Sequence, residues 1–106
     1  MNPRLKPDDL PRQVKGMVEA SSAFDEAEWK QRIKKWTTEL CRLYLAVIDA
    51  NRSMNEEARA ETVVKERAKF EGMCEKDDGM YIIVAITCLS DKALDDLANV
   101  LRQRLS

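Results

Sequence analysis

The sequence predicts an all-α fold, a compact bundle of four to five helices with one buried apolar helix near 80–89. The composition, 44% hydrophobic and 35% charged with three glycines and three prolines, is typical of a helix-rich globular protein. Apolar residues recur at spacings of three and four over most of the chain, which indicates amphipathic helices. A length of 106 residues fits one domain, so we expect a flexible N-terminal segment at 1–8 and a single helical domain at 9–106.

The beginning of the chain contains several prolines. Proline fixes the backbone φ angle and has no N–H to donate. We therefore expect extended or turn-like backbone there, with order beginning near Asp9. A short helix is expected next, with Asp9 as its N-cap and an apolar face at spacings of four, three and one. That face comprises Leu10, Val14, Met17 and Val18.

The segment at 25–51 shows the clearest helical pattern. Asp25 can cap the helix with Glu28 reaching back, while Phe24 and Trp29 are placed to form a hydrophobic staple. Six large apolar residues then recur at spacings of four and three, which predicts one continuous helix with a single packing stripe. The stripe comprises Trp29, Ile33, Trp36, Leu40, Leu43 and Val47.

Three further apolar residues of the same segment, Cys41, Leu45 and Ile48, lie away from that stripe. A helix that is apolar on two sides packs against more than one neighbour. We therefore expect this part of the helix to contact a second neighbour in the fold or a second subunit.

A third helix is expected after Asn51, with Ser53 as its cap and Glu56 three residues later as in a capping box. It should end near Gly79, which can form a turn. Its apolar face is intermittent, so we expect it to face mostly solvent. The face comprises Ala60, Val63, Val64, Phe70, Met73 and Cys74.

The apolar stretch at 80–89 has the β-branched and aromatic residues that strands favour. As a strand it would need a partner, and the chain has no second strand-like segment, so the partner would have to come from another subunit. As a helix it satisfies its own backbone and can pack on several sides. We favour the helix, and the intersubunit strand is the alternative.

The last helix is expected to begin at Ser90 or Asp91. Acidic residues lie early and arginines late, as the helix dipole favours. The repeated leucines predict that it packs into the core, and they are Leu94, Leu97, Leu101 and Leu105.

The residues that usually carry catalysis are scarce. Histidine is absent, which removes the commonest general base and metal ligand. Cys41, Cys74 and Cys88 form no CxxC pair, so we interpret them as reduced core thiols. No glycine-rich phosphate-binding loop is present, and the acidic clusters resemble solvated helix faces. We therefore expect no enzymatic activity and no cofactor or metal.

A basic cluster between the two tryptophans is the best candidate for an anion-binding surface. An ordinary solvated helix face is the favoured interpretation, because outward charge is what an amphipathic helix presents. The alternative is nucleic-acid or nucleotide binding through the basic face of the helix at 25–51. The basic residues are Lys30, Arg32, Lys34, Lys35 and Arg42.

These observations favour a non-enzymatic protein–protein interaction module. We expect it to bind and modulate a larger protein partner as an adaptor, chaperone or inhibitor, of a kind that a phage or other mobile element encodes. We also expect a homo-oligomer, with a dimer as the simplest case. The net charge of −1 provides no general attraction to nucleic acid, and no apolar run resembles a secretory signal or membrane span, so we expect a cytoplasmic protein without membrane contacts. The candidate interaction surface comprises Lys30, Arg32, Lys34, Lys35, Arg42, Leu45 and Ile48.

Overall fold

The computed structural model describes residues 5–18, 26–76 and 79–106. Within these ranges the chain forms six α-helices and two short 3-10 turns, and no strand. The all-α class is therefore confirmed. The expected four to five helices become six, because two of them are each broken in two and the first is replaced by 3-10 turns. The elements are η1 (Pro7–Asp9), η2 (Arg12–Val14), α1 (Glu26–Ile33), α2 (Thr38–Arg52), α3 (Glu56–Lys65), α4 (Arg67–Lys76), α5 (Met80–Thr87) and α6 (Asp91–Leu105).

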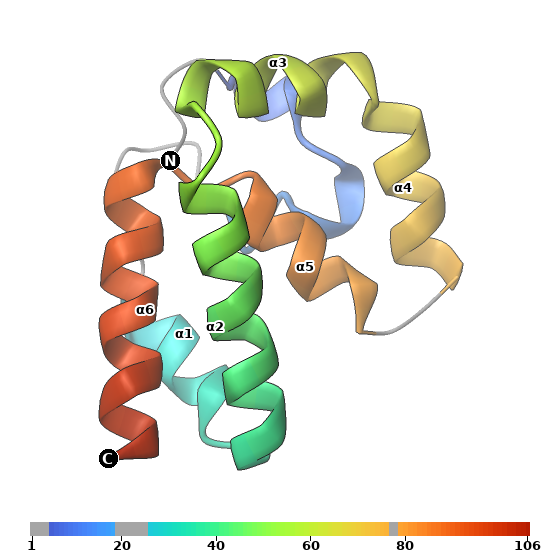
Figure 1. The fold of residues 1–106 in the computed structure, drawn as a ribbon. Helices are drawn as coiled ribbons and strands as arrows, with labels where there is room; N and C mark the ends of the chain where they lie inside the picture. The colour runs from blue at the N-terminus through green and yellow to red at the C-terminus, as the bar shows by residue number, and fades with distance from the viewer. Residues whose placement is uncertain (1–4, 19–25, 77–78) are drawn as a thin grey trace.

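Helices α2 and α6 run antiparallel and side by side along one edge of the molecule (Figure 1). Helix α3 lies across one end of this pair, and α4 descends from α3 along the opposite edge. Helix α5 runs obliquely between the two edges and contacts α2, α4 and η2. It is thus enclosed by elements from distant parts of the sequence.

The apolar stretch after Gly79 is helical, as predicted. Helix α5 spans Met80–Thr87, and its buried residues are Ile82, Val84, Ala85 and Ile86. Packing from several sides offsets the weak helix propensity of its β-branched residues, which costs at most ~0.7 kcal/mol each.

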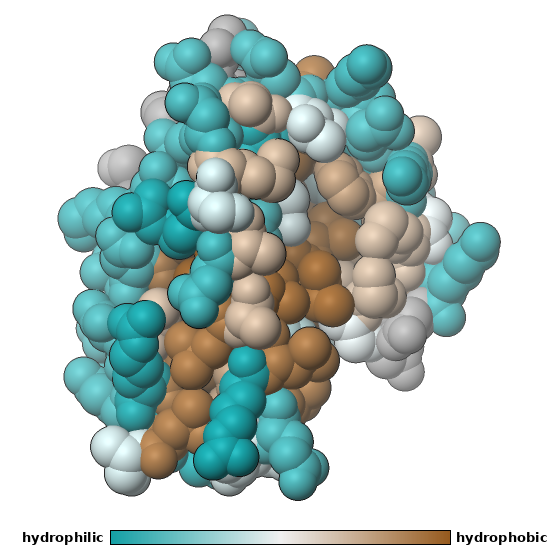
Figure 2. Space-filling model, viewed as in Figure 1, coloured by the Kyte–Doolittle hydropathy of each residue, from teal (hydrophilic) through white to brown (hydrophobic). Residues whose placement is uncertain are grey.

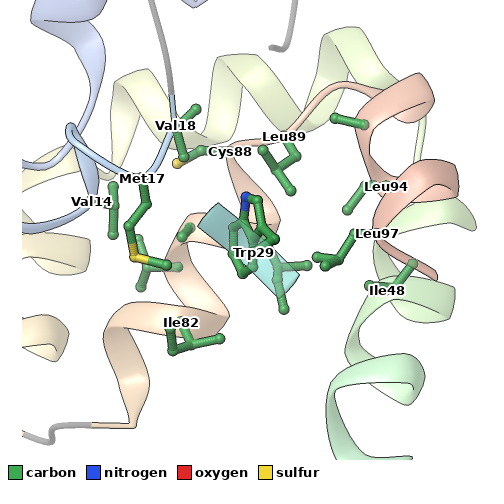
Figure 3. Close-up of a cluster of buried hydrophobic side chains, with 14 of the residues drawn as sticks. Val14, Met17, Val18, Trp29, Ile48, Ile82, Cys88, Leu89, Leu94 and Leu97 are labelled. Carbon is green, nitrogen blue, oxygen red and sulfur yellow. The ribbon is translucent and has the colours of Figure 1, made fainter. Parts of the chain in front are cut away.

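Trp29 of α1 lies at the centre of the core and is 2% exposed. Figure 3 shows side chains from the N-terminal turns, α2, α5 and α6 surrounding its indole ring. A large side chain buried in this way contributes on the order of 1.5–3 kcal/mol. Trp29 therefore joins α1 to the rest of the fold. The labelled neighbours are Val14, Met17, Val18, Ile48, Ile82, Cys88, Leu89, Leu94 and Leu97.

The N-terminal residues pack from Leu5 onward, before the expected start of order at Asp9. Leu5 and Leu10 are each 1% exposed. The short helix expected after Asp9 is instead a pair of 3-10 turns, and the Asp9 carboxylate accepts a hydrogen bond from Lys6 N at 3.1 Å. Apolar spacing alone does not distinguish a 3-10 turn from a helical turn, and Pro11 cannot donate the N–H that would join the two turns.

The prediction of one continuous helix at 25–51 is wrong, because the chain breaks between Ile33 and Thr38. Trp36 N donates to Ile33 O at 3.1 Å, a tightened last turn, and Thr37 is then extended. The Thr37 hydroxyl accepts from Leu40 N at 3.1 Å and begins α2 as its N-cap. Arg104 of α6 donates to the freed Trp36 carbonyl at 3.1 Å, so a tertiary contact stabilises the break.

Helix α6 begins where the sequence predicted, because the Ser90 hydroxyl accepts a hydrogen bond from Ala93 N at 3.2 Å and caps the helix. The expected cap at Asp25 and the staple from Phe24 to Trp29 lie outside the described residues.

The start of α3 differs from the prediction, because Asn55 and not Ser53 is its N-cap. The Asn55 side chain accepts from Glu57 N at 2.9 Å and Ala58 N at 3.2 Å. The Ser53 hydroxyl instead donates to Ala50 O at 2.6 Å and closes the end of α2. Ser53 directly follows the last residue of α2 and precedes α3 by three residues, so it can serve either helix, and local sequence does not decide which.

The third helix is also broken, because Glu66 leaves helical geometry at φ −104° and ψ 22°. The break lets α4 turn away from α3 and descend alongside α5 (Figure 1). The segment is mostly solvent-facing, as expected. Helices α3 and α4 bury only Arg59, Ala60, Val63 and Cys74, and three of these belong to the expected apolar face.

Candidate interaction surface

One face of α2 belongs to the core. Cys41, Tyr44 and Ile48 are 0%, 3% and 1% exposed, and Leu45 is half-buried against the core. The Tyr44 ring packs on Trp36 with the ring centroids 4.7 Å apart. Cys41 and Ile48, expected beyond the packing stripe, therefore contact their own chain, and Ile48 is reassigned from the candidate surface to the core.

The opposite face of α2 presents apolar side chains to solvent. Leu43, expected in the packing stripe, is 50% exposed, and Leu40 and Val47 are half-buried. Ala46 and Ala50 are exposed along the same helix. The reversal follows from the break before Thr38, because a new helix begins there and its rotation is not continuous with that of α1.

The apolar face continues from α2 onto its neighbour. Figure 2 shows an apolar area over α2 and the adjoining α5, with hydrophilic side chains over the outer side of α6. Helices α2 and α5 are in contact, and Ile83 of α5 is also only partly buried. A contiguous exposed apolar area of this kind is typical of a protein-binding surface. We call the exposed side of α2, comprising Glu39, Leu40, Arg42, Leu43, Ala46, Val47, Asp49 and Ala50, the α2 face.

The basic residues proposed from sequence are divided between different sides of α1. Lys30 and Lys34 line a shallow cleft of about 210 Å³ beside α6, whose Arg104 also lines it. The floor of this cleft is partly apolar, with Ile33 and Val100. Lys30 pairs with Glu26 at 3.2 Å, whereas neither Lys34 nor Arg104 forms an ion pair within the described part of the chain.

Arg32 and Lys35 line a different cleft, of about 360 Å³, with Trp36 and Tyr81. Glu28 also lines this cleft and lies 3.1 Å from Arg32 Nη2, so the two charges offset each other. Arg42 lies beyond the break, on α2. The five cations therefore form two separate groups and one isolated residue.

A buried arginine that the sequence analysis did not select joins α2, α3 and the start of α6. Arg59 is 0% exposed and donates to Asn51 O at 2.7 Å and to Leu89 O at 2.9 Å. Its Nη2 also lies 3.1 Å from the Asp91 carboxylate. Arg59 precedes Ala60 by one residue and Val63 by four. This position on the apolar face of α3 is the feature of the sequence that could have indicated its burial.

Asp91 is shared by two arginines. Besides Arg59, Arg52 Nη1 approaches the second Asp91 oxygen at 2.8 Å, and Arg52 Nε lies 3.0 Å from Asp95. The hydrogen bond to Asp91, followed by the charge of the same carboxylate, raises the pKa of Arg52. Glu56 accepts the Asp91 N–H at 2.7 Å. These contacts fix the C-terminal end of α2 against α6.

The three cysteines are free and buried. Burial, with a smaller contribution from the neighbouring Cys74, raises the pKa of Cys88 to about 12. Burial also raises the pKa of Cys74, with the charges of Glu71 and Glu75 adding to the effect. Thiols in this protonated state are poor nucleophiles, which agrees with a packing role.

No described helix combines the length and the apolar character needed to cross a membrane. Within the described ranges, no three histidine, cysteine, aspartate or glutamate side chains are placed to hold a metal ion. No protein-family model, curated protein or solved structure matches this chain.

Proposed function

We propose that this protein is a non-enzymatic protein–protein interaction module that binds and modulates a larger protein through the α2 face. The observation that carries the proposal is the exposure of Leu43, at 50%, in the middle of a helix whose flanking Leu40 and Val47 are only partly buried. Burying such side chains against a partner is favourable by roughly 25 cal/mol for each Å² of apolar area. An adaptor, a chaperone and an inhibitor would all use such a surface.

The firm packing of α2 against the rest of the fold supports this proposal. Thr37 caps the N-terminal end, and Arg59 binds the carbonyl oxygen of Asn51 at the other end. Cys41, Tyr44 and Ile48 anchor the opposite face in the core. A preformed helix loses little conformational entropy on binding, so more of the burial energy is available for affinity.

The test compares Leu43→Asp with Val64→Asp in affinity capture from a native lysate. Val64 is the matched control, because it is 47% exposed but lies on α3, away from the α2 face. We expect wild type and Val64→Asp to capture the same partner and Leu43→Asp to lose it. Circular dichroism confirms that each variant is folded. Equal capture by all three proteins, or capture of nothing by wild type, contradicts the proposal.

Nucleic-acid binding is the second candidate function, and the cleft between α1 and α6 favours it. Lys30, Lys34 and Arg104 surround this cleft and would together attract a phosphate group. If it binds DNA, Lys30→Glu with Lys34→Glu should weaken binding of a fluorescent oligonucleotide and flatten its salt dependence. Lys35→Glu with Arg42→Glu changes the net charge equally outside this cleft and is the control. Equal effects of the two double variants would contradict a localised phosphate site.

A further inference from the structure

We propose that a second copy of this chain docks on the α2 face, with the two α2 helices packed antiparallel about a two-fold axis. This inference rests on the proposed function, since it takes the same α2 face as the binding surface, where a second copy and the larger partner would compete. The self-complementary arrangement of side chains on that face carries the inference.

The centre of the α2 face has the spacing of a helix–helix seam. Leu43, Ala46 and Ala50 are exposed and follow one another at intervals of three and four residues. This is the a/d repeat by which two helices interdigitate. In an antiparallel pair Leu43 packs against the partner's Ala46, so a large side chain fills the space left by a small one.

The charged border of the seam favours an antiparallel second copy. Arg42 and Asp49 immediately precede Leu43 and Ala50, so both lie on the same side of the seam, seven residues or about two turns apart. Both are exposed, and neither forms an ion pair within the described part of the chain. Antiparallel packing places Arg42 opposite the partner's Asp49 and Asp49 opposite the partner's Arg42. Parallel packing would instead place both charged residues beside the partner's apolar border, formed by Leu40 and Val47, without an opposite charge.

The other border of the seam is apolar. Leu40 and Val47 are half-buried and pack against the core. Figure 2 shows that the apolar area over α2 continues onto α5. A docked helix would cover the exposed remainder of both side chains. Since α2 has 15 residues and is about 22 Å long, the interface is modest and the dimer should depend on protein concentration.

Analytical ultracentrifugation of the full chain over a range of concentrations tests the inference. We expect wild type and Val64→Asp to dimerise and Leu43→Asp to remain monomeric. Arg42→Glu and Asp49→Lys each place like charges at two symmetric contacts, so each should weaken the dimer about tenfold at low salt, and less at high salt.

The decisive measurement exchanges the charges at positions 42 and 49. The double variant Arg42→Glu/Asp49→Lys restores opposite charges and should recover the wild-type dimer. An equimolar mixture of the two single variants should form heterodimers, because each contact then joins opposite charges. A monomeric wild type, a dimer that survives Leu43→Asp, or a double variant no better than the single ones would overturn the inference.

The capture experiment separates this inference from the proposed function. If wild type is monomeric while Leu43→Asp still loses a captured partner, the second copy is the wrong occupant and the α2 face remains a binding surface. If Leu43→Asp changes neither the oligomeric state nor the capture, both proposals fail.

Discussion

Arg59 Nη2 lies 3.1 Å from Asp91 Oδ1, although the Arg59 side chain is only 1% exposed. An arginine remains charged in proteins, so its burial must be matched by acceptors. The carbonyl groups of Asn51 and Leu89 supply two of them, and each lies where a helix ends or a connection begins. The guanidinium therefore joins the end of α2 to the turn before α6.

Removing this guanidinium should destabilise the fold strongly. Arg59→Ala removes the side-chain donor of the Asn51 and Leu89 carbonyls and creates a cavity, so we expect a loss of about 3–5 kcal/mol in the free energy of unfolding. Urea denaturation measures the loss. Arg67→Ala is the control, because Arg67 forms only an exposed pair with Glu71 and should cost less than about 0.5 kcal/mol. Similar losses in both variants would contradict the structural role of Arg59.

The start of α3 gives a prediction that separates two candidate caps. Asn55→Ala should lower the free energy of unfolding by about 1 kcal/mol, because the Glu57 and Ala58 N–H groups lose their acceptor. Ser53→Ala should cost less than about 0.5 kcal/mol, since its hydroxyl only donates to the Ala50 carbonyl near an exposed helix end. Thermal or urea denaturation compares the two. The reverse order of losses would favour the Ser53 cap that the sequence suggested.

The buried Cys88 thiol should make stability depend on alkaline pH. Its pKa is raised in the folded protein from 9.0 to about 12, so folding favours the protonated thiol. This contribution is complete below pH 9 and is lost as the pH rises toward 12. Between pH 8 and pH 10, wild type should lose about 1 kcal/mol more than Cys88→Ala. Parallel pH profiles of the two proteins in urea denaturation would refute the assignment.

The order of thiol labelling should follow burial. Cys74 is 8% exposed, whereas Cys41 and Cys88 are each 0% exposed. A maleimide reagent should therefore modify Cys74 first in the folded protein, and all three should react much faster in urea. Mass spectrometry of peptides identifies the labelled residue at each time. Early labelling of Cys41 would be incompatible with its place in the core face of α2.

Several elements could be predicted because their determinants are local. The residues of α5 had no strand to pair with, so only a helix could satisfy their backbone. Ser90 stands immediately before a run with leucine at helical spacing, and it caps α6. Trp29 and Ile33 were assigned to the core, where each is 2% exposed.

The basic candidates divide because neighbouring positions along α1 and the turn that follows it point in different directions. Lys30 and Lys34 are four residues apart and share the cleft beside α6, whereas Arg32 and Lys35 share the cleft beside Tyr81. Leu45 and Ile48 were chosen as surplus apolar surface, yet α2 turns Ile48 into the core and leaves Leu45 at its edge. Whether any of these residues binds a partner stays a prediction.

The sequence by itself determined that this protein is helical, where its most apolar helix lies and that Trp29 enters the core, because these follow from spacing and backbone hydrogen bonding along the chain. Only the tertiary structure decided which side of α2 meets solvent. The break before Thr38 is held by Arg104, which is 68 residues away from Trp36 in the sequence, and this break sets the rotation of α2. No local pattern specifies such a contact, and it is the reason that Leu43, rather than Ile48, is exposed.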